Sequence, residues 1–241
     1  MRGDILKKKL MVLCAVAIMI STCLTGCKMN SGKIRFGSAG IGGTYQIFGD
    51  TFANLISSKS KKYNIEVKTT AGSAANLRLL SKDYIQMAVA QMDLINDAYN
   101  RTGIFENDKK YQGYRAVASL YTEACQIVVP ADSDIQSVDD LEGKRVCIGE
   151  EESGTEQNAL QILNAYGLNE RLVDTVNLNY TDAAKKLKSG DIDAFFCTAG
   201  VQTTVINELS KQCKIRLVSL DQKGVSRLKK SYKFYTEYTI P

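Results

Sequence analysis

Short apolar runs alternate along most of the chain with stretches in which apolar residues recur at helical spacing. The run at 33–37, for example, is followed by Tyr45, Phe48 and Phe52, which would share one face of a helix. Similar runs at 65–68 and 87–90 precede segments of helical period, the second of them at 92–99. Repeated strand–helix units of this kind predict parallel sheets covered by helices, and therefore an α/β fold.

The alternation is interrupted once, where two strand-like runs at 116–120 and 126–130 follow each other without a helix between them. A second series then begins. It predicts strands at 145–148, 175–180, 192–197 and 215–220, and helices at 155–166, at 182–188 and along the Val201–Leu209 face. Two β-α-β lobes with a ligand cleft between them account for this pattern. We assign 33–120 to lobe one, 121–212 to the hinge and lobe two, and 213–241 to a return to lobe one.

The first 27 residues follow a different pattern. Basic residues precede an apolar run from Leu10 to Ile20, and Leu24-Thr25-Gly26-Cys27 comes after it. This order is typical of an export signal, and a cysteine after Leu-Thr-Gly is the pattern of a bacterial lipobox. It predicts a signal peptide at 1–26, acylation of Cys27, a tether at 27–32 and an extracytoplasmic protein anchored to the cell membrane by lipid. A transmembrane anchor is the alternative, but the apolar run is shorter than the roughly 20 residues that a span needs.

Composition narrows the possible functions. Removing residues 1–26 takes away four basic residues and one acidic residue, so the formal net charge falls from +5 to +2. This balance gives no electrostatic reason to expect nucleic acid as a partner. The chain has no histidine, which removes the commonest general base and most zinc and haem sites. We therefore expect no enzyme, metal or cofactor, and a ligand affinity that is nearly flat between pH 6 and pH 8.

Four cysteines remain after the signal and the lipidation site are set aside. They are widely spaced, form no C-x-x-C pattern and lie in or beside apolar runs: Cys125, Cys147, Cys197 and Cys213. Disulfides are possible in an exported protein, and buried free thiols are at least as compatible with these positions.

Three predicted loops share one design, in which small or hydroxylated residues lie between a strand end and a helix start. They are residues 37–45, 71–76 and 152–156. Free amides at a helix N-terminus attract anions, and glycine lets the backbone approach a ligand. Helix capping alone would explain one such loop, but three at one cleft favour an anion site. A dinucleotide site is poorly supported, because Tyr45 stands where the third glycine of G-x-G-x-x-G should be.

Several ordered blocks closely resemble the TAXI family, the solute-binding subunits of one class of TRAP transporters. The blocks are Gly42–Tyr45, Gly72–Leu80, Ala118–Tyr121, Gly154–Ala159 and Asp193–Gly200. The resemblance runs from about Ile34 to Pro241. It implies the type II periplasmic-binding-protein fold, a small carboxylate ligand similar to glutamate or 2-oxoglutarate, and delivery to a TRAP permease driven by an ion gradient. We expect a monomer.

The resemblance also implies which residues bind the ligand. They are Thr44, Tyr45, Ser73, Asn76, Gln91, Tyr121, Ser153, Gly154, Thr155, Thr198, Ala199 and Gly200. Tyr121 could equally pack at the hinge, and Glu123 at the crossover could touch the ligand. Arg78 lies a turn and a half into its helix, where an ion pair is the better interpretation.

Family members continue beyond the length of this chain, so the sequence suggests a shortened product. Two alternatives stay open. One is the receptor of an ABC importer, which shares the fold; the other is an enzyme on the same two-lobed scaffold.

Overall fold

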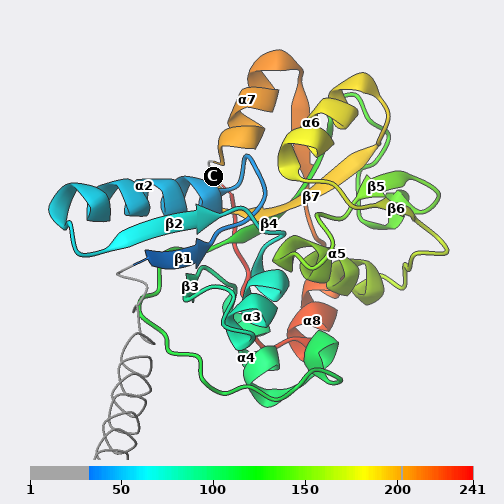
Figure 1. Ribbon diagram of the computed structural model, residues 1–241. Helices are drawn as coiled ribbons and strands as arrows, with labels where there is room; N and C mark the ends of the chain where they lie inside the picture. The colour runs from blue at the N-terminus through cyan, green and yellow to red at the C-terminus, as the bar shows by residue number, and fades with distance from the viewer. Residues whose placement is uncertain (1–32, 202, 241) are drawn as a thin grey trace, which may run out of the picture.

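The structure is a computed structural model that describes residues 33–201 and 203–240. The predicted signal peptide, the tether and Cys27 lie outside the described residues. The described chain contains two sheets, one of three strands and one of five, with helices packed on their faces (Figure 1). This arrangement confirms the predicted two-lobed α/β fold.

The three-stranded sheet forms the core of lobe one. Its order is β2 (Asn64–Lys68), β1 (Lys33–Gly37) and β3 (Met87–Ala88), and all three strands are parallel. Helix α2 (Thr44–Lys59) packs on this sheet, where a side chain at Gly49 would meet Val67 and Phe36 at 3.1 and 3.3 Å. The small residue therefore lets the helix approach the strands closely.

Two further helices, α3 (Ser73–Ser81) and α4 (Met92–Asn100), build a second apolar cluster in lobe one with the 3-10 turn η1 (Gly103–Phe105). Leu77 and Leu94 are fully buried there, as the helical spacing of apolar residues predicts.

The five-stranded sheet forms lobe two. Its order is β6 (Asp174–Val176), β5 (Arg145–Cys147), β7 (Ala194–Ala199), β4 (Ala124–Pro130) and β8 (Ile215–Val218). Strand β4 is antiparallel to both of its neighbours, and β5 is parallel to β6 and β7. Helices α6 (Tyr180–Ser189) and α7 (Thr204–Gln212) cover one face, and α5 (Gly154–Ala165) and α8 (Gln222–Ser231) cover the other (Figure 1).

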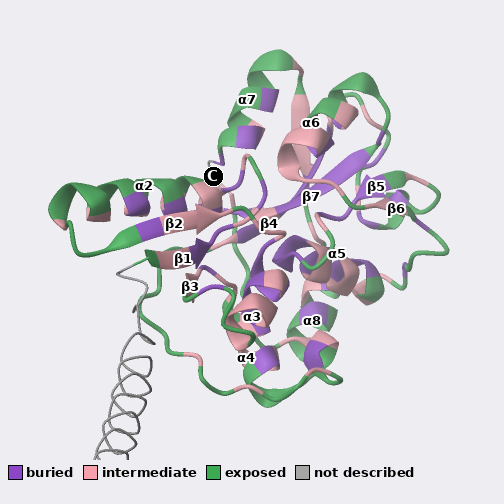
Figure 2. Ribbon diagram, in the orientation of Figure 1, coloured by how far each residue is buried: buried purple, intermediate pink, exposed green. Residues whose placement is uncertain are grey.

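The central strands of this sheet are buried on both faces. Ile127 and Val129 belong to the core cluster under α5, while Val128 between them belongs to the cluster under α6 and α7. Likewise, Phe196 belongs to the cluster under α5 and Phe195 to the cluster under α6 and α7. This alternation follows from the two-residue period of a strand. Figure 2 shows the buried residues concentrated in β7 and in the inner face of α5, with the outer face of α2 exposed.

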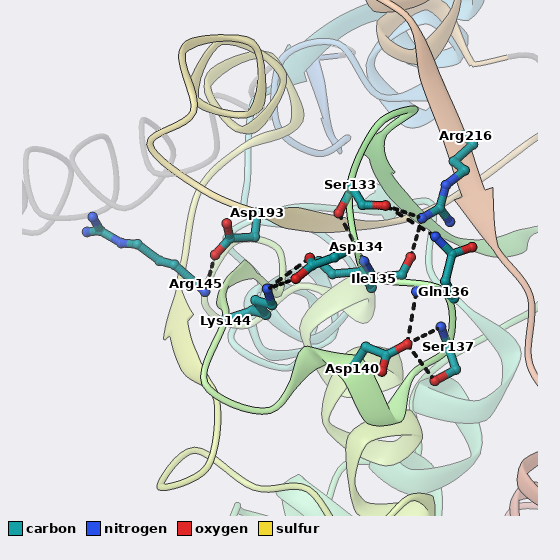
Figure 3. A network of polar contacts seen from close by, with 10 residues as sticks. All are labelled: Ser133, Asp134, Ile135, Gln136, Ser137, Asp140, Lys144, Arg145, Asp193 and Arg216. Atoms are coloured by element: carbon teal, nitrogen blue, oxygen red, sulfur yellow. Dashed lines mark hydrogen bonds and ion pairs between the residues drawn. The ribbon is translucent and has the colours of Figure 1, made fainter.

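A polar network fixes the loop between β4 and β5, which contains the 3-10 turn η2 (Asp139–Leu141) (Figure 3). Arg216 of β8 donates to the carbonyl oxygens of Ser133 and Ile135. Lys144 pairs with Asp134 at 2.8 Å, and the Asp193 carboxylate accepts from the Arg145 amide at 2.7 Å. Because Arg145 and Asp193 mark the amino ends of β5 and β7, this network lies at the end of the sheet opposite to the loops that follow these strands.

Three predictions about elements are wrong. Residues 116–120 form no strand, because no neighbouring strand pairs with them and Val117 is 82% exposed. The strand predicted at 175–180 ends at Val176, because Tyr180 already begins α6. The strand predicted to return to lobe one is β8, which hydrogen-bonds with β4 in the five-stranded sheet, and α8 after it packs on α5. Its apolar side chains add to the lobe-two core instead.

The four cysteines of the described chain are free thiols, two of them buried and two half-buried. This result agrees with the interpretation as buried thiols. Among the described residues, no helix combines the length and the apolar character needed to cross a membrane.

Candidate functional site

A small cavity of about 40 Å³ lies where the two lobes face each other. The chain segments around it are the loops after β1, β2 and β5 and the end of β7, together with the N-terminal residues of α2, α3, α5 and α6. Parallel strands in each lobe place their carboxyl ends toward the cavity, which is where open α/β sheets bind ligands. The cavity is therefore the candidate ligand site.

The N-terminus of α5 presents free donors to this cavity. Ser153 caps the helix, because its hydroxyl oxygen accepts from the Glu156 amide at 3.0 Å. The amides of Gly154 and Thr155 have no acceptor among the described residues and lie in the first turn, where the helix dipole favours an anion. Ser153 is thus a capping residue, and the backbone amides after it are the candidate anion-binding element.

The Thr155 hydroxyl forms its hydrogen bonds within lobe two. It accepts from the Thr198 amide at 3.3 Å and contacts the Tyr180 hydroxyl, which itself donates to the Thr198 carbonyl at 2.9 Å. Since Tyr180 has only one hydroxyl hydrogen, the Thr155 hydroxyl donates to Tyr180. It therefore has no hydrogen left for a ligand, and it joins α5, α6 and β7 instead.

Gln91 connects the lobes from the start of α4. Its amide nitrogen donates to Asn158 Oδ1 of α5 at 2.9 Å, and Asn158 Nδ2 donates to the Tyr235 hydroxyl at 2.8 Å. Because the Tyr235 hydroxyl donates to Gln161 at 2.6 Å, this chain of bonds fixes the orientation of both amides. Gln91 Oε1 is then left buried without a hydrogen-bond partner, beside Gly154.

Glu123 lies just before β4, in the connection between the lobes. Its carboxylate accepts from the Tyr45 hydroxyl at 3.0 Å and from the Tyr121 hydroxyl at 3.4 Å. Burial raises the pKa of Glu123 to about 7, although hydrogen bonds from Tyr45, Tyr121 and Gln91 lower it in part. The flat affinity expected between pH 6 and pH 8 rested on the absence of histidine, whereas the pKa of the buried Glu123 carboxyl falls inside this range.

Ten of the twelve predicted ligand residues line the cavity: Thr44, Tyr45, Ser73, Gln91, Tyr121, Ser153, Gly154, Thr155, Thr198 and Ala199. Asn76 and Gly200 do not. Asn76 is fully buried beneath the cavity, where its amide donates to the carbonyls of Ser38 at 2.7 Å and Val89 at 2.9 Å. These hydrogen bonds of Asn76 hold the ends of β1 and β3 together. Gly200 lies past the end of β7, beside Thr44 and Tyr121.

The cavity also contains residues that the sequence reasoning missed: Glu150, Leu178, Asn179 and Tyr180. Asn179 caps α6 by accepting from the Asp182 amide at 2.9 Å. An Asn three residues before an Asp is a common helix start, and reading it as such would have ended the preceding strand earlier and placed Tyr180 at the cleft.

Arg78 lies outside the cavity and forms ion pairs, as its position in the helix predicts. It pairs with Asp108 of lobe one at 2.8 Å and with Glu152 of lobe two at 2.7 Å. The Ala75 amide also donates to the Glu152 carbonyl, at 3.1 Å. These bonds join the start of α3 to the loop before α5 and hold the lobes together beside the cavity.

The two lobes, their sheets and the cavity between them define a type II periplasmic-binding-protein fold. The chain belongs to the NMT1-like family, whose model matches residues 36–241.

Solved structures with the same fold are similar to this chain at low identity. The alkanesulfonate-binding protein SsuA from Xanthomonas axonopodis pv. citri shares 19% identity with a TM-score of 0.52, over 78% of this chain and 60% of that protein. The aliphatic sulphonate-binding protein SsuA from Escherichia coli shares 18% with a TM-score of 0.50, over 78% and 60%. A binding protein component of an ABC phosphonate transporter from Pseudomonas aeruginosa shares 12% with a TM-score of 0.54, over 83% and 73%. The chain thus spans about 60% of the length of the SsuA proteins that it matches.

Proposed function

We propose that this protein is an extracytoplasmic, lipid-anchored solute-binding protein that captures a small carboxylate and delivers it to a membrane permease. The observation that carries the proposal is the set of helix N-termini that converge on one cavity from both lobes. A ligand that touches both lobes stabilises their closed arrangement, and a permease can recognise that arrangement.

The free amides of Gly154 and Thr155 form the proposed carboxylate site. Hydrogen bonds to a charged group contribute roughly 1.5–3 kcal/mol each, so two of them supply a large part of the ~8 kcal/mol that micromolar binding requires. The Ser153 hydroxyl can add a third donor, because its oxygen already accepts from Glu156 and its hydrogen is free to turn toward the ligand.

The proposed permease is of the TRAP type, driven by an ion gradient. The support is the resemblance of five sequence blocks to the TAXI subunits, each of which contributes residues to the cavity wall. The receptor of an ABC importer is the second candidate, favoured by structural neighbours that include a component of an ABC phosphonate transporter. A neighbouring gene for a many-helix permease without an ATPase gene would support the first candidate and exclude the second.

Thermal unfolding of the full chain with a panel of small mono- and dicarboxylates tests the binding function. Binding of a ligand to the folded state raises Tm, and we expect at least one carboxylate to do so in a concentration-dependent way. A panel without any such shift would contradict the proposal. Recovery of the bound carboxylate unchanged after long incubation would support a receptor, whereas turnover would support an enzyme on this scaffold.

A further inference from the structure

We propose that Glu123 receives a cationic nitrogen of the ligand, so that the cavity takes a small zwitterion, an ammonium together with a carboxylate, in preference to an oxo acid or a dicarboxylate. This inference deepens the proposed function and rests on it. It assigns Glu123 to ligand specificity, and it assigns the α5 N-terminus to the carboxylate of the same ligand.

The charges around the cavity favour such a ligand. Glu123 and Glu150 both line it, and the lining residues include no lysine or arginine. The nearby Arg78 is bound to Asp108 and Glu152 and lies outside the cavity. The free amides of Gly154 and Thr155 at the α5 N-terminus suit one carboxylate. A second carboxylate would face Glu123 and Glu150 without a lysine or arginine of the lining to pair with it.

The hydrogen-bond inventory of the cavity leads to the same conclusion. Gln91 Oε1 and Thr198 Oγ1 are buried in the cavity wall without a partner, and Gln91 Oε1 can only accept. An ionised carboxylate offers about four acceptor positions, of which the Tyr45 and Tyr121 hydroxyls use two at Glu123. Acceptors without donors thus remain on the cavity wall. An ammonium group supplies the three N–H donors that these acceptors lack, and a keto oxygen supplies none.

A simpler role for Glu123 is to hold the two tyrosines in place at the hinge. That role makes no distinction between an amino acid and its oxo acid, because the tyrosines would be held equally in both complexes. Comparing ligand pairs that differ only in the amine therefore separates the two roles without altering the protein.

The experiment measures binding of three such pairs to the full chain by thermal unfolding and calorimetry at pH 8, where Glu123 is ionised. The pairs are L-alanine and pyruvate, L-leucine and 4-methyl-2-oxopentanoate, and L-glutamate and 2-oxoglutarate. We expect at least one amino acid to bind tenfold or more tightly than its oxo acid. In Glu123→Gln this preference should shrink by about tenfold, whereas Glu170→Gln, which removes an exposed carboxylate outside the cavity, should keep it.

Oxo acids that bind as tightly as their amino acids would overturn this inference and leave the proposed capture of a carboxylate intact. An unchanged preference in Glu123→Gln would overturn it as well. If neither set of ligands binds, the proposed function fails together with the inference. The comparison on the wild-type chain decides the question even if a variant does not fold.

Discussion

At the scale of single residues, Thr155 illustrates how a hydroxyl that looks suited to a ligand can be committed to the fold. Replacing it by valine keeps the shape and removes the link to Tyr180 and to the Thr198 amide. We expect Thr155→Val to lower the free energy of unfolding by about 1–3 kcal/mol, because buried polar groups lose their partner. Thr155→Ser keeps the hydroxyl and should lose less. Urea unfolding of both variants measures the difference, and equal losses would contradict this assignment.

At Gly154, the backbone of α5 lies directly against the Gln91 side chain from the other lobe. A Cβ built on Gly154 would lie 1.7 Å from Gln91 Oε1. We therefore expect Gly154→Ala to push the lobes apart and to weaken ligand binding by tenfold or more. Combining it with Gln91→Ala removes the clash and should cost less than the two single changes together. Calorimetric titration of the four proteins forms the cycle, and additive losses would show that the clash is irrelevant.

The carboxyl of Glu123 gives the fold a pH dependence. Its pKa rises from 4.5 to about 7 on folding, so the native state binds more protons than the unfolded chain between these values and stability falls as pH rises. Below pH 4.5 the contribution is fully present, and it is lost through pH 7. We expect wild type to lose about 3 kcal/mol relative to Glu123→Gln over this window. Urea unfolding at several pH values measures it.

Burial sets the sign of this effect, and the groups around Glu123 change its size. Hydroxyl or amide donors, one carboxylate and two thiols face it from the elements that pack around it: Tyr45, Gln91, Tyr121, Tyr180, Asp93, Cys125 and Cys197. Desolvation is the largest influence on the pKa of Glu123, and the Asp93 carboxylate raises it further. A wild-type stability that rises between pH 5 and pH 7 relative to Glu123→Gln would refute the assignment.

Single residues could be predicted where chemistry repeats along the chain. Ser73, Ser153 and Gly154 could be placed at the cleft, because the pattern of small and hydroxylated residues between a strand end and a helix start is local in the sequence. The raised pKa of Glu123 could not be predicted, since it depends on Tyr45, 78 residues away in sequence, and on burial between the lobes. The position of Asn76 beneath the cavity could not be predicted for the same reason, because its partners Ser38 and Val89 lie in distant segments of the chain.

At the scale of elements, periodicity predicted nearly every helix and strand of lobe two except α8. That helix has only two buried residues, Gly224 and Leu228, so its apolar face is too narrow to recognise. The run at 116–120 shows the opposite case, a predicted strand that does not form. A short, largely apolar segment is compatible with a strand, but a strand exists only where another strand pairs with it.

Between elements, the ion pair of Arg78 in α3 with Glu152 before α5 couples the lobes. Glu152→Gln should weaken ligand binding about two- to fivefold, because a partly exposed pair contributes up to about 1 kcal/mol to the closed arrangement. Asp108→Asn is the matched control, since it removes the Arg78 partner within lobe one. Calorimetry should show normal affinity for the control, and equal weakening in both variants would exclude a role in closure.

At the scale of the whole molecule, the cleft is closed by few direct bonds. Besides the Arg78 pair, the Ala75 amide donates to the Glu152 carbonyl at 3.1 Å, Thr181 donates to the Ile41 carbonyl at 3.2 Å and Gln91 donates to Asn158. With so few links, the balance between open and closed lobes is sensitive to any ligand that adds contacts to both sides. The fold thus favours a receptor whose shape reports occupancy.

The proposed lipid anchor is Cys27, which lies outside the described residues. We expect Cys27→Ser to remain unprocessed or to be released from the membrane, because serine has no thiol to form the thioether to lipid. Cys23→Ser is the control, since it alters a cysteine four residues earlier and leaves Leu24-Thr25-Gly26-Cys27 intact. Membrane fractionation and intact mass of both variants provide the measurement. If Cys27→Ser fractionates like wild type with a mass lower only by the substitution, the anchor is not on this residue, and a spanning N-terminal segment becomes the better explanation.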